Sequence, residues 1–179
     1  MKPVRPPSMP AALRRKGAVP AVLLAALTGP LAVASLERWE GNVLHVYADR
    51  LAGGLPTYCA GRTDATARVG ARLTSDQCRE INKITLIEYG YEVLACTEWS
   101  HLTERRLIGL TLFAINVGKA GACSSQAVHQ INAGHIAAGC RLLSTRPDGT
   151  PNWSYIGGEY NPGLQNRRLA ERDLCLDGV

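Results

Sequence analysis

Histidine is scarce in this 179-residue sequence, and no two cysteines form a C-x-x-C pair. Structural zinc sites are built mainly from closely spaced cysteine and histidine, so the sequence gives little support for a metal centre. The sequence also lacks an internal repeat and a motif that interleaves aromatic and basic residues. The second absence speaks against a nucleic-acid-binding protein, although the formal net charge of +5 suits an anionic partner. The four histidines, which show no metal-ligand spacing, are His45, His101, His129 and His135.

Six cysteines are spread over most of the chain. An even number predicts disulfide bonds and therefore an oxidising compartment. The alternative is a set of buried free thiols in a cytoplasmic protein. Six cysteines allow fifteen pairings, and the sequence selects none of them. They are Cys59, Cys78, Cys96, Cys123, Cys140 and Cys175.

The first 36 residues resemble an export signal, because basic residues precede an uncharged, largely apolar stretch at 17–36. Ala32-Val33-Ala34 before Ser35 resembles a signal-peptidase site. Three interpretations remain: a cleaved signal peptide, a permanent anchor, and a signal-arrest-release segment that later leaves the membrane. All three place the rest of the chain outside the cytoplasm. Many alanines and the interruptions at Pro20 and Pro30 favour release over permanent anchoring. The alternative is a buried helix of a soluble protein.

The part of the chain after this leader begins with mixed secondary structure. Residues 37–47 have apolar residues at helical spacing. Residues 55–60 are predicted to form a strand that pairs with residues 67–71. Thr74 and Gln77 have the spacing of a capping box, which predicts that a long helix starts there.

The second half is predicted to be helical. A helix that starts at Ser100 and ends at 116–118 is apolar nearly all round, so we expect it to be the core helix. Three further helices are expected at 125–132, 135–143 and 164–176.

Three residues could carry glycosidic chemistry. Glu40 lies in the first helical pattern, Asp49 follows it just before a glycine pair, and Thr57 falls in the expected strand. Glycoside hydrolysis commonly uses two carboxyl groups that flank the bond, one protonated and one ionised. Two acids and a threonine also occur by chance on protein surfaces, so this set alone does not identify an enzyme.

Four sequence blocks strengthen that interpretation. They are WEG at 39–41 with YAD at 47–49 and LPT at 55–57, FAINVG at 113–118, INAG at 131–134, and GLQNRR at 163–168 followed by Glu171 and Cys175. In this order they resemble the phage lysozymes, glycoside hydrolase family 24. The chain departs from the family pattern in two places. The stretch between Asp49 and Thr57 is longer, with the extra residues at 52–54, and Arg62 stands where the family often has histidine.

The resemblance implies an α+β, lysozyme-like fold with a small N-terminal lobe containing a β-hairpin, a long linking helix and a helical C-terminal lobe. It implies a leader at 1–36 and a lysozyme domain at 37–179. The implied activity is hydrolysis, with inversion, of the β-1,4 bond between N-acetylmuramic acid and N-acetylglucosamine in peptidoglycan, for host lysis. Glu40 is expected to donate a proton, Asp49 to orient or activate a water, and Thr57 to hydrogen-bond that water. Inversion implies carboxyl groups about 6.5–9.5 Å apart.

The resemblance also suggests that the leader is a signal-arrest-release segment. The protein would then act first at the periplasmic face of the host inner membrane and later in the periplasm. Because the leader has no cysteine, we expect activation by refolding rather than by thiol exchange. The expected partners are the peptidoglycan strand and, before release, the inner membrane. We expect a monomer without cofactor, metal or nucleic acid.

Asn116, Trp153 and Arg168 are further candidates for substrate binding. Each has a structural alternative: Asn116 could cap a helix, Trp153 could pack in the interior, and Arg168 could pair with Glu171 on one helix face. Two rival functions also remain. A lytic transglycosylase would cleave the same bond without a water-positioning Asp49, and a membrane-tethered peptidoglycan-binding protein would not need Glu40.

Overall fold

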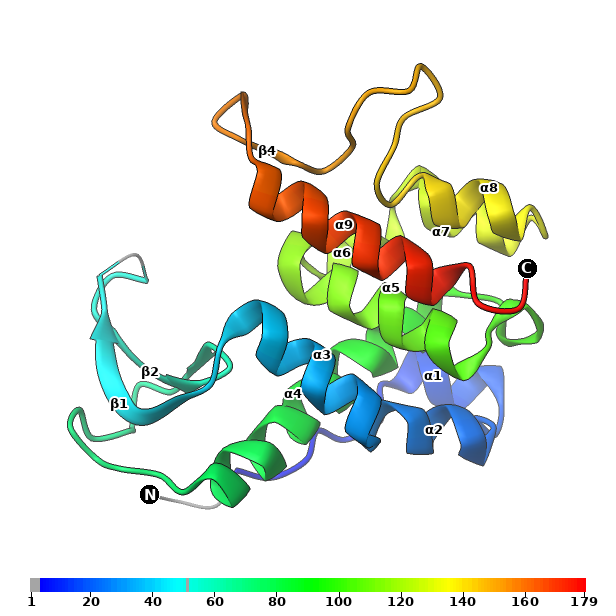
Figure 1. The fold of residues 1–179 in the computed structure, drawn as a ribbon. Coiled ribbons are helices and arrows are strands. Elements are labelled where there is room, and N and C mark those ends of the chain that lie inside the picture. The colour runs from blue at the N-terminus through cyan, green and yellow to red at the C-terminus, as the bar shows by residue number, and fades with distance from the viewer. Residues whose placement is uncertain (1–3, 51) are drawn as a thin grey trace. The chain divides into compact units, whose positions relative to one another are not determined.

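A computed structural model describes residues 4–50 and 52–179 (Figure 1). The chain forms two compact units. The sheet unit contains Thr28–Glu88 with the described N-terminal residues up to Ser8, and the helical unit contains Met9–Leu27 with Tyr89–Val179. The helices are α1 (Ala11–Lys16), α2 (Ala21–Thr28), α3 (Pro30–Glu40), α4 (Ser75–Cys96), α5 (Glu104–Val117), α6 (Lys119–Cys123), α7 (Gln126–Asn132), α8 (Ile136–Arg141) and α9 (Pro162–Cys175). The strands are β1 (Val43–Asp49), β2 (Leu55–Cys59), β3 (Arg62–Thr63), β4 (Tyr155–Ile156) and β5 (Glu159–Tyr160).

The sheet unit contains an antiparallel sheet in the order β1-β2-β3. Its first strand shows that the predicted helix at 37–47 is wrong beyond Glu40. Gly41 ends α3 with a φ of 74°, a conformation that glycine adopts readily, and its N–H donates to the Glu37 carbonyl. The residues that follow include the strand formers Val43 and Tyr47, which pair with β2.

Residues 67–71 do not pair with β2 as predicted. β3 takes that place, and the 67–71 segment instead hydrogen-bonds to β1. The Val46 N–H donates to the Ala71 carbonyl at 2.9 Å, and the Gly70 N–H donates to the Val46 carbonyl at 2.8 Å. The segment thus satisfies backbone groups of β1 that β2 does not reach.

The long helix α4 starts as the sequence predicts. The Thr74 N–H donates to Gln77 Oε1 at 2.8 Å, and the Gln77 N–H donates to Thr74 Oγ1 at 3.1 Å, which completes the capping box. A disulfide between Cys59 and Cys78 then ties the end of β2 to the first turns of α4. A small apolar core that includes Val46 surrounds this bridge.

The core of the helical unit lies around α5, as predicted, and α9 packs along it (green and red in Figure 1). The two backbones approach closely at Gly109, because a Cβ there would lie 2.6 Å from the Glu171 carbonyl oxygen. The predicted start of α5 needs correction. A 3₁₀ turn occupies Trp99–His101, and Thr103 rather than Ser100 caps α5 by accepting the Arg106 N–H.

The leader does not form one continuous helix in this structure. Pro20 precedes α2, and Gly29 separates α2 from α3. Three leucines of the first two helices, Leu13, Leu23 and Leu27, are buried in the core of the helical unit. Within the described residues, no single helix is long and apolar enough to cross a membrane, whereas α2 and α3 taken as a pair are, by length and composition.

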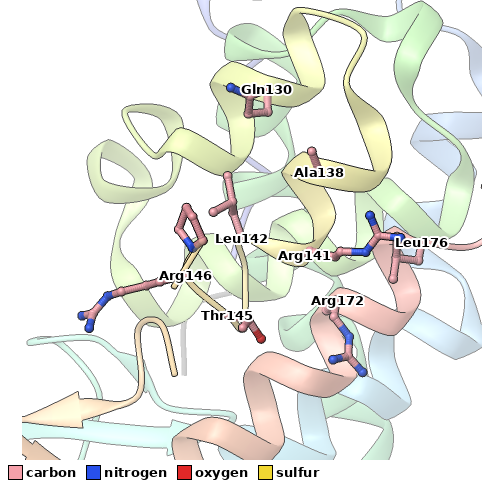
Figure 2. A pocket seen from close by; sticks show the side chains of 9 residues that line it. Gln130, Ala138, Arg141, Leu142, Thr145, Arg146, Arg172 and Leu176 are labelled. Atoms are coloured by element: carbon pink, nitrogen blue, oxygen red, sulfur yellow. The ribbon is translucent and has the colours of Figure 1, made fainter. Parts of the chain in front are cut away.

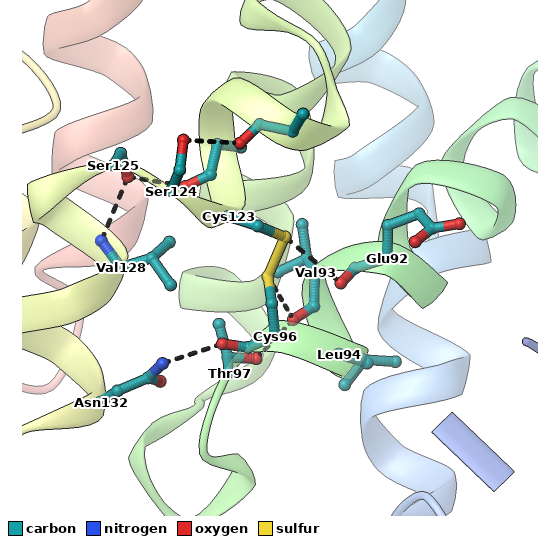
Figure 3. The surroundings of a disulfide bond; sticks show 12 residues. Glu92, Val93, Leu94, Cys96, Thr97, Cys123, Ser124, Ser125, Val128 and Asn132 are labelled. Carbon is teal, nitrogen blue, oxygen red and sulfur yellow. Dashed lines mark hydrogen bonds between the residues drawn. A yellow bond between two sulfur atoms is a disulfide. The ribbon is translucent and has the colours of Figure 1, made fainter. Parts of the chain in front are cut away.

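All six cysteines form disulfides, which the even number predicted, in the pairs Cys59–Cys78, Cys96–Cys123 and Cys140–Cys175. Figure 3 shows the second bridge, which joins the end of α4 to α6. Beside it, Asn132 at the end of α7 donates from Nδ2 to the Cys96 carbonyl at 2.8 Å (Figure 3). The sequence did not predict α6 or the short β4–β5 hairpin.

Candidate active site

Glu40 is the last residue of α3, a helix that begins with Pro30 in its first turn. This position gives the side chain a fixed backbone, because Gly41 stops the helix immediately after it. Glu40 is half-buried, and its Oε1 atom is shielded from solvent. The structure thus holds this carboxyl group at a fixed helix end, and a positioned carboxyl group is what glycoside cleavage requires.

Asp49 and Thr57 lie on neighbouring strands of the same sheet. Asp49 pairs with Leu55, and Tyr47 pairs with Thr57. Side chains two positions apart on a strand share a face, so this register places Asp49 and Thr57 diagonally on one face of the sheet. Asp49 is half-buried and Thr57 is almost fully buried, with 2 % of its surface exposed.

The extra residues between Asp49 and Thr57 are accommodated in the turn between β1 and β2. The N–H groups of Gly54 and Ala52 donate to the Asp49 carbonyl at 2.7 and 3.2 Å. Pairing resumes at Leu55, so the longer turn leaves the strand register around Thr57 intact. The Thr57 hydroxyl donates to the Leu55 carbonyl at 3.1 Å, and its oxygen keeps a lone pair that can accept a hydrogen bond from water.

One contact that sequence reasoning missed anchors the end of α3. Glu37, one turn before Glu40, accepts hydrogen bonds at Oε1 from Asn82 Nδ2 at 3.0 Å and from Asn42 Nδ2 at 3.2 Å. Asn82 lies on α4, is 1 % exposed, and accepts the Ala60 N–H at Oδ1 at 3.2 Å. Asn82 therefore joins α3, α4 and the end of β2. The signal in the sequence was an asparagine next to Ile81, the first residue of the apolar pattern of α4.

The residues after β2 add a second tie to α4. Arg62 donates from Nη1 to Glu88 Oε2 at 3.0 Å, with both side chains about one-third exposed or less. Burial raises the pKa of the Tyr58 hydroxyl above its ordinary value, the charge of Asp64 raises it further, and Arg62 opposes this. Tyr58 is thus a neutral interior group at physiological pH.

The other three candidate residues all lie in the helical unit. Arg168 is fully buried and donates from Nη2 to Asn116 Oδ1 at 2.8 Å. Its Nε lies 3.1 Å from Glu171 Oε2, and its guanidinium lies over the Phe113 ring. Trp153 is 38 % exposed. Its ring packs edge-on against Phe113, the ring over which Arg168 lies, with 5.4 Å between the two ring centroids. The structure thus pairs Asn116 with Arg168, and it places Arg168 and Trp153 against the same phenylalanine ring.

Among the residues that the structure describes, no group of three or more His, Cys, Asp or Glu side chains could hold a metal ion.

The α+β fold, with an N-terminal antiparallel sheet, the long helix α4 and a helical C-terminal region, is that of a lysozyme-like protein. Residues 37–171 match the family model described as phage lysozyme. The chain belongs to the phage lysozyme family, and it is accordingly a glycoside hydrolase. The family and the fold class expected from the sequence are both confirmed.

Two relatives and two solved structures illustrate the similarity. The SAR-endolysin of Bacteriophage PS119 is 29% identical over 165 residues, which cover 88% of this chain and 93% of that protein. The SAR-endolysin of Enterobacteria phage P21 is 28% identical over 178 residues, 95% of this chain and 99% of that protein. A crystal structure of a phage P22 lysozyme mutant has a TM-score of 0.68 at 23% identity, covering 83% of this chain and 97% of that one. The active form of the P1 phage endolysin has a TM-score of 0.68 at 20% identity, covering 90% and 97%.

Proposed function

We propose that this protein is an endolysin that hydrolyses the β-1,4 bond between N-acetylmuramic acid and N-acetylglucosamine in peptidoglycan during host lysis. The observation that carries the proposal is the placement of Glu40, Asp49 and Thr57 in one compact unit, at a helix end and on one sheet face. The similarity to SAR-endolysins along almost the whole chain supports the biological role.

In the proposed mechanism, protonated Glu40 donates its proton to the glycosidic oxygen as the bond to the anomeric carbon breaks. Ionised Asp49 accepts a proton from a water that attacks the anomeric carbon from the opposite face. Thr57 holds that water by accepting a hydrogen bond from it at Oγ1. Such a single displacement inverts the anomeric configuration, and the two carboxyl groups then exchange protons with solvent for the next cycle.

Replacement of Glu40 by Gln tests this mechanism. The full-length oxidised protein should clear a suspension of outer-membrane-permeabilised Gram-negative cells, whereas Glu40→Gln should lose at least about 100-fold in rate because it cannot donate the proton. Glu80→Gln is the matched control, since Glu80 is an exposed acid on α4 of the same unit. Equal activity of Glu40→Gln and Glu80→Gln would refute the role of Glu40.

Product analysis separates the reaction from its rivals. NMR of the first products should show the inverted anomer, and mass spectrometry should show the addition of one water for each bond cleaved. An anhydro sugar would identify a lytic transglycosylase. Binding of peptidoglycan by a folded protein without any cleavage would identify a non-catalytic binding protein.

We propose further that residues 1–36 are a signal-arrest-release leader that tethers the chain to the inner membrane before lysis, and that residues 37–179 are the lysozyme domain. Cleavage before Ser35 would cut through α3, the helix that carries Glu40, and would remove Leu13, Leu23 and Leu27 from the core of the helical unit. The fold therefore favours a leader that is kept rather than cleaved.

Fractionation tests the leader. The intact chain should stay with the membrane until the membrane is depolarised and then appear in the periplasm with its N-terminus unprocessed, as read by intact-mass measurement. Prompt processing before Ser35, or a chain that stays in the membrane after depolarisation, would contradict the proposal.

A further inference from the structure

The helical unit has a cavity of about 690 Å³ between α7, α8 and α9 (Figure 2). Its apolar wall includes Leu142 and Leu176. The charged residues that line it are all arginines: Arg141 at the end of α8, Arg146 in the segment that follows, and Arg172 on α9. An apolar wall with only cationic charge fits a ligand that has both an anionic group and an apolar part.

The three arginines differ in the ion pairs and ring contacts that they form with other side chains. Arg172 donates to Asp173 at 2.7 Å, whereas the Arg141 guanidinium forms no ion pair within the described residues and is exposed. Arg146 lies over the Tyr155 ring, 5.5 Å from its centroid, and its charge also acts on exposed Asp148. At least Arg141 is therefore available for an anion.

Arg146 lines the cavity and also contacts the β4–β5 hairpin, which carries exposed apolar side chains. Tyr155, over which it lies, packs edge-on against Tyr160 across the β4–β5 hairpin, with ring centroids 6.0 Å apart. Ile156 beside them is 61 % exposed, and Tyr160 is 49 % exposed. Glu159 is the acid of this hairpin and pairs in the ladder with Ile156. Exposed tyrosines and an isoleucine on a two-strand hairpin leave apolar surface in contact with water, which is unfavourable. The same side chains suit a membrane–water interface.

We propose that this cavity and the β4–β5 hairpin form a docking surface for an anionic phospholipid bilayer. Arg141 and Arg146 bind the lipid phosphates, while Tyr155, Tyr160 and Ile156 enter the interface. Charge complementarity together with the exposed apolar side chains of the hairpin favours this occupant over a glycan strand, whose sugar rings are uncharged and whose acidic stem peptides offer no apolar layer for the hairpin. The surface is built entirely from residues of the helical unit and would keep the folded enzyme near the membrane after the leader has left it.

Vesicle binding tests the docking surface. The full-length protein is sedimented with vesicles of phosphatidylcholine alone or with added phosphatidylglycerol. Arg141→Gln with Arg146→Gln should weaken binding to the anionic vesicles about 25-fold, since each arginine near an anionic surface contributes about 5-fold. The control pair Arg68→Gln with Arg79→Gln removes the same charge from exposed positions of the sheet unit. It should change binding less than about 3-fold.

A further variant and one activity assay complete the test. Ile156→Ser should weaken anionic vesicle binding about 5-fold through lost apolar burial. Cleavage of purified, membrane-free peptidoglycan should be the same for all these variants, which separates this surface from the proposed catalytic function. If both pairs of arginine substitutions weakened vesicle binding equally, the effect would depend on net charge alone, and this would overturn the proposal. Equal binding to neutral vesicles, or binding of a soluble acidic stem peptide in place of the vesicles, would also overturn it.

Discussion

Asn82 is expected to be the side chain on which the position of α3 most depends. It donates to Glu37 at 3.0 Å and accepts the Ala60 N–H at 3.2 Å, so its loss affects three elements together. Asn82→Ala removes a hydrogen bond to a carboxyl group, which contributes about 1.5–3 kcal/mol, and leaves a buried N–H without a partner, which costs about 1–3 kcal/mol. The free energy of unfolding should fall by about 2.5–6 kcal/mol.

Urea or thermal unfolding of the oxidised protein measures this loss. A change of that size corresponds to a melting temperature lower by about 5–24 °C for a chain of this length. Thr85→Val is the matched control on the same helix, because among the described residues the Thr85 hydroxyl donates only to the Ile81 carbonyl of its own helix, at 3.4 Å. That variant should cost less than about 1 kcal/mol.

A double-mutant cycle isolates the contact between α3 and α4. Glu37→Ala and Asn82→Ala should be non-additive by about 1.5–3 kcal/mol, because the second change removes a hydrogen bond that the first has already broken. Asn82→Asp should be as damaging as Asn82→Ala at neutral pH, since it sets a second carboxylate against Glu37, and should recover partly toward about pH 4. Full additivity, or equal stability of Asn82→Ala and Thr85→Val, would refute the reasoning.

Two further substitutions test the packing of each unit. The Tyr58 hydroxyl is buried and has no hydrogen-bond partner among the described residues, so Tyr58→Phe should keep the stability or raise it by up to about 1 kcal/mol. Because burial raises the pKa of Tyr58 in the folded state, stability should fall as pH rises above about 10, and urea unfolding should show a smaller alkaline loss in the Phe variant. A Cβ at Gly90 would lie 2.5 Å from the Leu27 methyl carbons, so Gly90→Ala should cost about 1–3 kcal/mol. Much of that cost should disappear when Leu27→Ala is also present; a cost that persists in full would show that the leader does not press on α4 at this point.

Local signals predicted the helices well. The capping box at Thr74, the apolar periodicity of α4 and the apolar surface of α5 are contained within a few turns of chain, and the structure confirms them. The strand β1 could not be found in this way, because its apolar residues fit a helical spacing too. Its conformation depends on pairing with β2 and on the 67–71 segment, contacts that the local pattern does not contain.

The candidate site likewise contains residues that the sequence predicted and a contact that it did not predict. Glu40, Asp49 and Thr57 were singled out by their resemblance to a family pattern, and their chemistry alone would not have separated them from surface groups. The Asn82–Glu37 hydrogen bond joins residues 45 positions apart, and nothing in the local sequence pairs them. A buried asparagine on an apolar helix face indicates that a hydrogen-bond partner lies nearby, because a buried amide needs one. It does not identify that partner.

The proposed release of the leader has an energetic basis in its charges. Five basic residues precede the apolar stretch, and in the membrane-bound form they would lie on the cytoplasmic side. In the folded protein one of them, Lys16, donates to the Thr97 carbonyl and lies over the Trp99 ring. These contacts form only if the basic end of the leader is on the same side of the membrane as the enzyme. A membrane potential of 100 mV opposes that transfer by about 2.3 kcal/mol per charge, about 11 kcal/mol for five. Leu23 and Leu27 pass from the apolar interior of the bilayer to the apolar core of the helical unit, so their burial there offsets little of that barrier. Loss of the potential would remove the barrier, so the same leader would hold the enzyme inactive in an energised cell and complete its core after depolarisation.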